Sequence, residues 1–217
     1  MMSSELINKT AEYVKATMVK EGTGHDWFHI ERVWHLAKAI QAKEGGDLEI
    51  VELAALLHDI ADWKFSDGDL DAGAKVSREW LTQINAPVDV IDHVCEIVGT
   101  LSYKGAGVPD KMKTIEGQIV QDADRLDAIG AIGIARCFAY GGHKNRPLYD
   151  PEVKLVNHAT FEEYKNKEGT AFNHFYEKLF LLKDRLNTQA AKKIAQGRHE
   201  FMQEFVDRFL KEWNGQD

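Results

Sequence analysis

An imidazole and a carboxylate stand next to each other in one of the most apolar stretches of the chain. His58 and Asp59 follow the run LAALL (residues 53–57) and precede Ile60. Burying both groups without polar partners would cost several kcal/mol. A backbone carbonyl and a backbone amide could satisfy a lone His-Asp pair, whereas a divalent metal ion could be bound by both side chains. A metal ion would require further ligands from elsewhere in the chain.

Two other segments place histidines and aspartates in apolar helical patterns. They are GHDWFHIERV (residues 24–33), with His25 and His29, and VQDADRLDAI (residues 120–129), with Asp122, Asp124 and Asp127. Three helices that each bring His or Asp to a buried face are typical of metal sites in helix bundles. Imidazoles and carboxylates without a thiolate favour Mn²⁺, Fe²⁺, Co²⁺, Ni²⁺ or Mg²⁺ over a closed structural zinc site. The pattern alone leaves open which histidine and which aspartate would bind.

The spacing of apolar residues predicts the helices that would position these segments. Apolar side chains recur at intervals of three and four. We expect helices over residues 3–20, 27–43, 48–62, 72–84, 90–101, 114–139, 172–186 and about 201–213. The GGD at residues 45–47 predicts the end of one helix and the N-cap of the next. Stretches 102–110 and 141–160 are expected to be loops, the second lying over the site. The sequence therefore predicts an all-α protein.

Composition narrows the class of protein. The 217 residues are 44% hydrophobic and 29% charged, with a formal net charge of -8. This composition suits a globular chain with ample core and argues against a duplex nucleic acid partner, which needs a basic face. No signal peptide is visible, and no apolar run approaches the ~18 residues of a membrane span. We expect a cytoplasmic protein without membrane contact, in which Cys95 and Cys137 are buried free thiols.

The order of the candidate ligands resembles a known signature. His29, then His58-Asp59, then Asp124 is similar to the H…HD…D series of the HD-domain phosphohydrolase superfamily. Longer stretches resemble its bacterial single-domain branch, described as nucleoside triphosphate pyrophosphohydrolases: GHDWFHIERVWHLA, LAALLHDIADWKF, VQDADRLDAIGAIGIAR, RPLYDP, HFYEKLFLLKDRL and GRHEFM. The resemblance covers roughly residues 24–210, which is nearly the whole chain.

This resemblance implies an architecture. The protein would be an all-α, multi-helix bundle of HD-domain type with additional C-terminal helices. One domain would span residues 1–217, with a metal-binding core over about 24–140 and C-terminal helices over about 160–213 that cover the site. The protein would be a monomer or a homodimer.

The resemblance also implies the metal ligands. His29, His58, Asp59 and Asp124 would hold one divalent ion, with Mn²⁺ favoured and Mg²⁺, Co²⁺, Ni²⁺ or Fe²⁺ as alternatives. His25 then falls outside the ligand set, and Asp122 and Asp127 are competing carboxylates. Some HD enzymes bind a second metal through additional histidines, but no pair with the required spacing is found here. A divalent ion activates water and neutralises charge on phosphoryl oxygens, which is what phosphate ester and anhydride hydrolysis requires.

Other polar residues near these segments are candidates for catalysis and substrate binding. Asp62, four residues after His58, is expected to act as general base or to position water, and Lys64 follows it closely. Guanidinium and ammonium groups suit the remaining phosphates. The expected substrate contacts are Arg32, Lys104, Arg125, Asp127, His174 and Lys178. A local structural or surface role is the alternative for each of them.

The activity implied by the resemblance is hydrolysis of (deoxy)nucleoside triphosphates to the monophosphate and pyrophosphate. One alternative is a 5′-nucleotidase, or another phosphomonoesterase or phosphodiesterase of the superfamily. A second alternative is a non-catalytic module that senses nucleotides. Release of pyrophosphate or of orthophosphate would separate the enzymes, and binding without turnover would identify the sensing module.

Overall fold

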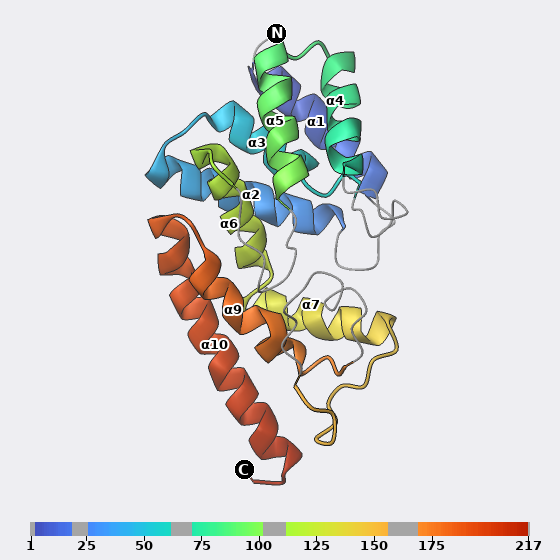
Figure 1. Ribbon diagram of the computed structural model, residues 1–217, viewed down its shortest axis with the longest axis vertical. Coiled ribbons are helices and arrows are strands. Elements are labelled where there is room, and N and C mark those ends of the chain that lie inside the picture. Colours follow the sequence, from blue (N-terminus) through green and yellow to red (C-terminus); the bar gives the residue numbers. More distant parts are fainter. Residues whose placement is uncertain (1–2, 19–25, 62–70, 102–111, 156–168, 217) are drawn as a thin grey trace. The chain divides into compact units, whose positions relative to one another are not determined.

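The computed structural model describes residues 3–18, 26–61, 71–101, 112–155 and 169–216 (Figure 1). Within these ranges the regular structure is helical and no strand is present, which confirms the expected all-α class. The chain divides into two compact units, Met1–Tyr103 with Pro109–Ala123, and Lys104–Val108 with Asp124–Asp217. The sequence predicts one domain in which C-terminal helices cover the site. This arrangement depends on how the two units combine, so it stays a prediction.

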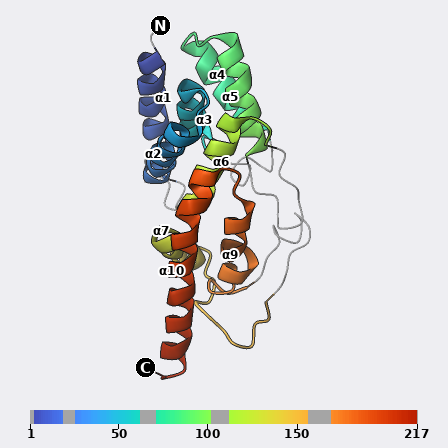
Figure 2. The same ribbon diagram turned by 90° about the vertical axis from the view of Figure 1, so that its left-hand side faces the viewer.

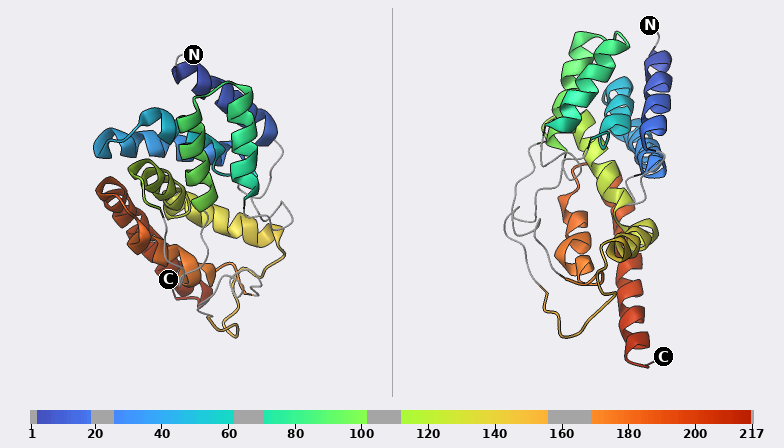
Figure 3. Two further views of the ribbon diagram at one scale, coloured as in Figure 1. Left: turned by 45° about the horizontal axis from the view of Figure 1, so that its top comes forward. Right: turned by 90° about the vertical axis from the view of Figure 1, so that its right-hand side faces the viewer.

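The first unit is a bundle around one short apolar helix. Its helices are α1 (Ser3–Met18), α2 (Trp27–Glu44), α3 (Leu48–Leu57), α4 (Ala72–Gln83), α5 (Val88–Thr100) and the first part of α6 (Ile115–Asp127). The α3 helix packs against α1, α2 and α5, and α4 packs against α5 (Figure 3). Every α3 residue from Ile50 to Leu57 is buried. A helix that is apolar on all sides lies at the centre of a bundle, as the sequence predicts.

Local capping signals fix where α2 and α3 begin. The Asp26 side chain caps α2 by accepting a hydrogen bond from the backbone N–H of His29. Gly45 ends α2 with a φ of 81°, a conformation that glycine adopts without strain. Asp47 then caps α3 and accepts from the N–H groups of Glu49 (2.8 Å) and Ile50 (3.3 Å). The predicted GGD boundary is therefore confirmed.

The predicted helix over residues 48–62 is wrong at its C-terminal end. The α3 helix ends at Leu57, and His58 to Ala61 form a turn in which the Ile60 N–H donates to the Leu57 carbonyl (3.1 Å). The His58 Nδ1 lies 2.8 Å from the Ala55 carbonyl oxygen. In a continuing α-helix that oxygen would accept from the N–H of residue 59. The imidazole thus takes a backbone acceptor that another helical turn would use.

The second unit contains the remainder of α6, then α7 (Gly130–His143) and α10 (Gln189–Trp213), which pack against each other (Figure 2). The single long helix predicted over residues 114–139 is therefore wrong, because α6 and α7 are separate helices. Ile129 is extended (φ -125°, ψ 164°) and Gly130 has a φ of +76°. A Cβ at Gly130 would lie 2.9 Å from Cγ of Arg198 on α10. The glycine is needed for both the backbone turn and the close approach.

The segment predicted as one α-helix over residues 172–186 changes geometry twice. It contains the π-helical η2 (Phe175–Leu179), one turn of α9 (Phe180–Leu182) and the 3₁₀-helical η3 (Lys183–Arg185). The apolar spacing predicts that this segment is helical, but it does not predict the changes of helical pitch. Short π-helical turns are rare and often lie at functional sites.

Aromatic side chains form the core of the second unit. Phe138 of α7 contacts Phe175 (5.9 Å between ring centroids) and Phe205 of α10 (6.0 Å). Phe209 stacks on Phe172 with centroids 4.6 Å apart. The aromatic stripe predicted over residues 201–213 is thus confirmed at Phe205 and Phe209, whereas Phe201 is 47% exposed and Trp213 is 48% exposed. None of the helices in the described ranges has the length and apolar character of a membrane span.

Candidate metal centre

The first candidate ligand lies in the first turn of α2. The backbone N–H of His29 is held by the Asp26 carboxylate (3.0 Å) and by the Asp26 carbonyl oxygen (3.1 Å). The His29 side chain is fully buried. Its neighbours Trp27 and Ile30 are also buried, whereas Phe28 is 63% exposed. The capped first turn therefore fixes an imidazole on the inner face of the helix.

The second and third candidate ligands lie at the C-terminal end of α3. The ring of His58 is fully buried, and its Nδ1 faces the Ala55 carbonyl oxygen at 2.8 Å. A carbonyl can only accept, so Nδ1 is the donor in this contact, and Nε2 is the ring nitrogen that faces His29. This arrangement is typical of a histidine that binds metal through Nε2, because the outer hydrogen bond fixes tautomer and orientation.

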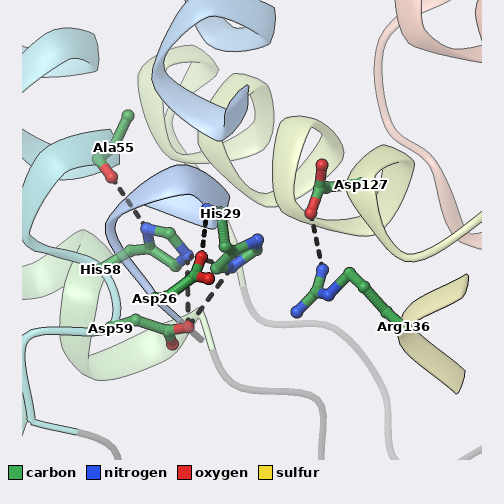
Figure 4. A network of polar contacts seen from close by, with 7 residues as sticks. All are labelled: Asp26, His29, Ala55, His58, Asp59, Asp127 and Arg136. Carbon is green, nitrogen blue, oxygen red and sulfur yellow. Dashed lines mark hydrogen bonds and ion pairs between the residues drawn. The ribbon is translucent and has the colours of Figure 1, made fainter. Parts of the chain in front are cut away.

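Three ligand atoms from these two helix ends converge (Figure 4). The Nε2 atoms of His29 and His58 are 3.2 Å apart, and Asp59 Oδ2 lies 3.4 Å from the first and 3.7 Å from the second. Among the described residues these three form the one group of possible metal ligands whose atoms all lie within 4.8 Å of one another. Metal–nitrogen bonds of about 2.1 Å at a right angle would separate two nitrogens by about 3.0 Å. The group therefore fits a divalent cation with mixed N/O ligands.

The aspartates of α6 lie at the division between the two units. Asp122 is fully buried and belongs to the first unit, whereas Asp124 is half-buried and opens the second. The fourth ligand, Asp124, therefore stays a prediction. His25 lies outside the described residues.

The predicted substrate contacts have varied surroundings. Arg32 is half-buried on α2, one turn after His29. Arg125 is buried and donates to the Arg185 carbonyl oxygen. Asp127 is also buried and pairs with Arg136 at 2.6 Å, so a surface location for this carboxylate is wrong.

The remaining candidates are divided between the second unit and the undescribed segments. His174 precedes η2, Lys178 lies within it, and both are half-buried. Asp62, Lys64 and Lys104 lie outside the described residues. The roles of all these residues in catalysis or substrate binding stay predictions.

Two histidines outside the cluster have different environments. His93 on α5 has its Nε2 3.7 Å from Glu116 Oε2, with no third ligand in the described part of the chain. His199 on α10 packs edge-on against Phe180, with ring centroids 5.2 Å apart. Burial lowers the pKa of His199, and nearby Lys183 lowers it further, while Asp184 and Glu200 act in the opposite direction.

One buried polar group on α3 is not predicted by the sequence pattern. Glu52 is only 5% exposed in the middle of α3, and it contacts Trp34 and Lys38 of α2. The available signal is a carboxylate within LEIVELAALL, the same anomaly that identifies His58 and Asp59. Its partners are 14 to 18 residues away and could not be read from local spacing.

Known proteins resemble this chain along nearly its whole length. Residues 27–129 match the family model of the HD domain. YpgQ of Bacillus subtilis is 39% identical over 94% of this chain and 92% of its own length.

Solved structures agree with this match. YpgQ in complex with ADP has a TM-score of 0.76 at 36% identity and covers 97% of this chain and 100% of its own. An HD-superfamily hydrolase from Bacillus thuringiensis has a TM-score of 0.76 at 44% identity (98% and 99% covered). A Lactobacillus plantarum protein has a TM-score of 0.86 at 36% identity (99% and 100% covered). The chain belongs to the HD-domain family and is a metal-dependent hydrolase of the HD superfamily.

Proposed function

We propose that this protein hydrolyses (deoxy)nucleoside triphosphates to the monophosphate and pyrophosphate, with a divalent ion of the Mn²⁺ type. His29, His58, Asp59 and Asp124 would hold the ion. The observation that carries the proposal is the convergence of two buried imidazole nitrogens and one carboxylate oxygen, with the Nε2 atoms 3.2 Å apart.

The chemistry of this ligand set supports a reaction at phosphate rather than a structural role. Two neutral imidazoles and two carboxylates hold a divalent ion with four ligand atoms and leave coordination positions open for water and a phosphate oxygen. When bound, the ion would supply Lewis acidity and activation of water. The protein's own contribution is a rigid and largely apolar support, since His29 is fixed by the α2 cap and His58 by the Ala55 carbonyl.

The nucleotide part of the proposal is supported by a relative. YpgQ, which covers 97% of this chain, is known in complex with ADP. A nucleoside diphosphate presents a base, a ribose and a phosphoanhydride, which are also the groups of a triphosphate. The predicted roles of Asp62 and Lys64 in catalysis belong to this proposal, as do the substrate contacts Arg32, Lys104 and Arg125. The same applies to Asp127, His174 and Lys178.

The test is a nucleotide panel in which the two possible products are measured separately. Metal-free protein is supplied with Mn²⁺, Mg²⁺, Co²⁺ or Ni²⁺ and with each common ribo- or deoxyribonucleoside triphosphate or monophosphate. Orthophosphate is then assayed with and without added inorganic pyrophosphatase. We expect phosphate from the triphosphates only when pyrophosphatase is present, together with the matching monophosphate on ion-exchange chromatography.

The controls assign the activity to the candidate site. Asp59→Ala should lose turnover, whereas Asp89→Asn, which changes an exposed carboxylate on α5, should keep it. Direct orthophosphate release would contradict the proposed products and indicate a phosphatase or nucleotidase. Tight nucleotide binding without turnover under every ion would indicate a sensing module instead.

A further inference from the structure

A buried carboxylate lies on the helix that leads to His58. Glu52 is 5% exposed, and its neighbours Val51, Leu53 and Ala54 are fully buried. Removing a charged carboxylate from water is costly unless several donors replace the water. Glu52 is not among the ligand atoms that converge at the candidate metal centre. Its position therefore requires an explanation apart from metal binding.

The contacts of Glu52 join α3 to α2 at a single oxygen atom. Glu52 Oε1 accepts a hydrogen bond from Trp34 Nε1 (3.0 Å) and pairs with Lys38 Nζ (2.8 Å). Lys38 Nζ also lies 5.2 Å from the centroid of the Trp34 ring. Trp34 and Lys38 are four residues apart, so they lie on the same face of α2. The two donors and the carboxylate form one cluster, which we call the α2–α3 tie.

The tie lies close to the candidate ligands along both helices. Trp34 follows His29 by five residues, and Glu52 precedes His58 by six. At 1.5 Å per residue these separations are about 7.5 Å and 9 Å along the helix axes. The hydrophobic effect that packs α2 against α3 is itself non-directional. Hydrogen bonds to one oxygen are directional and fix both the axial position and the rotation of the helices.

We propose that Trp34, Glu52 and Lys38 are positioning residues that set the separation of the His29 and His58 Nε2 atoms and thereby the affinity of the site for its metal ion. This inference depends on the proposed function, in which these imidazoles bind the ion. A displacement of one helix by about 1 Å would destroy the ligand geometry that a first-row metal ion requires. Partners that orient ligands from outside the coordination shell contribute about 10- to 100-fold to metal affinity.

The same unit offers a matched control for the indole hydrogen bond. Trp80 of α4 donates its Nε1 hydrogen to Thr10 Oγ1 of α1, also at 3.0 Å, and both tryptophans are half-buried. Neither Trp80 nor Thr10 lies on a helix that carries a candidate ligand. Trp34→Phe and Trp80→Phe thus each remove one indole hydrogen bond of the same length. Only the hydrogen bond of Trp34 joins α2 to α3, the helices that carry or lead to the candidate ligands.

The experiment measures Co²⁺ binding and thermal stability for the wild type and both variants. Co²⁺ affinity is determined by competition with a chelator, and the ligand-field absorption spectrum reports the coordination geometry. We expect Trp34→Phe to raise the Kd for Co²⁺ about tenfold and to change the spectrum. Trp80→Phe should lower the melting temperature of the metal-free protein while leaving both Kd and spectrum at wild-type values. Glu52→Leu, a second variant of similar volume that has no acceptor for either donor, should also raise the Kd.

The possible failures are distinguishable. If wild-type protein does not bind Co²⁺ in a manner that requires Asp59, the proposed function fails. If wild-type binding is intact and Trp34→Phe leaves Kd and spectrum unchanged, or if Trp80→Phe changes them equally, the tie has only a general structural role and the inference is overturned. If Trp34→Phe does not fold, Glu52→Leu decides in the same way.

Discussion

Removal of the α2 N-cap should weaken metal binding, whereas removal of the α3 N-cap should weaken only the fold. The Asp26 carboxylate accepts from the His29 N–H at 3.0 Å and so holds the turn that carries the candidate ligand. Replacing an aspartate N-cap with alanine costs about 1 kcal/mol. Metal binding must then order the first turn of α2 again, and the free energy of ordering is subtracted from that of binding. A loss of about 1 kcal/mol raises the Kd for Mn²⁺ about fivefold.

Two further variants separate capping from charge and from general stability. Asp26→Asn keeps a good N-cap and should bind metal within about twofold of the wild type. Asp47→Ala removes the cap of α3, whose hydrogen bonds go to Glu49 and Ile50 rather than to a ligand. It should lower the free energy of unfolding by a similar amount without changing the Kd. Isothermal titration and urea denaturation measure the two quantities, and equal Kd values for Asp26→Ala and Asp47→Ala would refute the reasoning.

Three further predictions concern the second unit. Gly130→Ala should destabilise it by about 2 kcal/mol in urea denaturation, because φ is +76° and the new Cβ would meet an arginine side chain at 2.9 Å. Gly197→Ala should instead stabilise the unit by about 1 kcal/mol, because a Cβ at Gly197 would have no atom within 4 Å. If both substitutions changed the free energy of unfolding in the same direction, these predictions would be wrong. Asp127→Asn should lower the free energy of unfolding by about 2 kcal/mol, because it weakens the 2.6 Å hydrogen bond that charged Arg136 donates to Asp127. A double-mutant cycle that shows no coupling between the two residues would contradict this prediction. Burial lowers the pKa of His199 below its ordinary 6.5, so the unfolded chain binds a proton more readily than the folded chain. The free energy of unfolding is therefore unaffected by this histidine above about pH 6.5 and decreases as the pH falls below that value. The melting temperature between pH 7.5 and 5 should therefore fall less in His199→Gln than in the wild type, and identical slopes would show that His199 contributes nothing.

The boundaries of α2 and α3 could be predicted because their signals are local. Asp26, Gly45 and Asp47 act on backbone groups within a few residues of themselves. The candidate site was also predictable in part, because His58 and Asp59 are anomalous within an apolar run and the burial penalty demands a partner. The structure adds that, among the described residues, His29 lies within reach of both.

Other features depend on contacts distant in sequence and could not be predicted. The break between α6 and α7 requires Gly130 to face Arg198, which comes 68 residues later. At the end of α3 the His58 imidazole contacts the Ala55 carbonyl, and the apolar spacing gives no sign of this contact. Apolar spacing reports which face of a segment is buried, and a short extended residue or a π-helical turn leaves that spacing almost unchanged.

The most direct test of the account is the metal content of Asp59→Ala beside that of the wild type. Metal-free samples are dialysed against Mn²⁺, the bound ion is quantified by elemental analysis, and circular dichroism monitors the helices. We predict about one Mn²⁺ per wild-type chain and none in the variant, with equal helix content, because the loss of Asp59 leaves two imidazoles without the carboxylate 3.4 Å and 3.7 Å away. A folded Asp59→Ala protein that retains stoichiometric Mn²⁺ would contradict the assignment of the site.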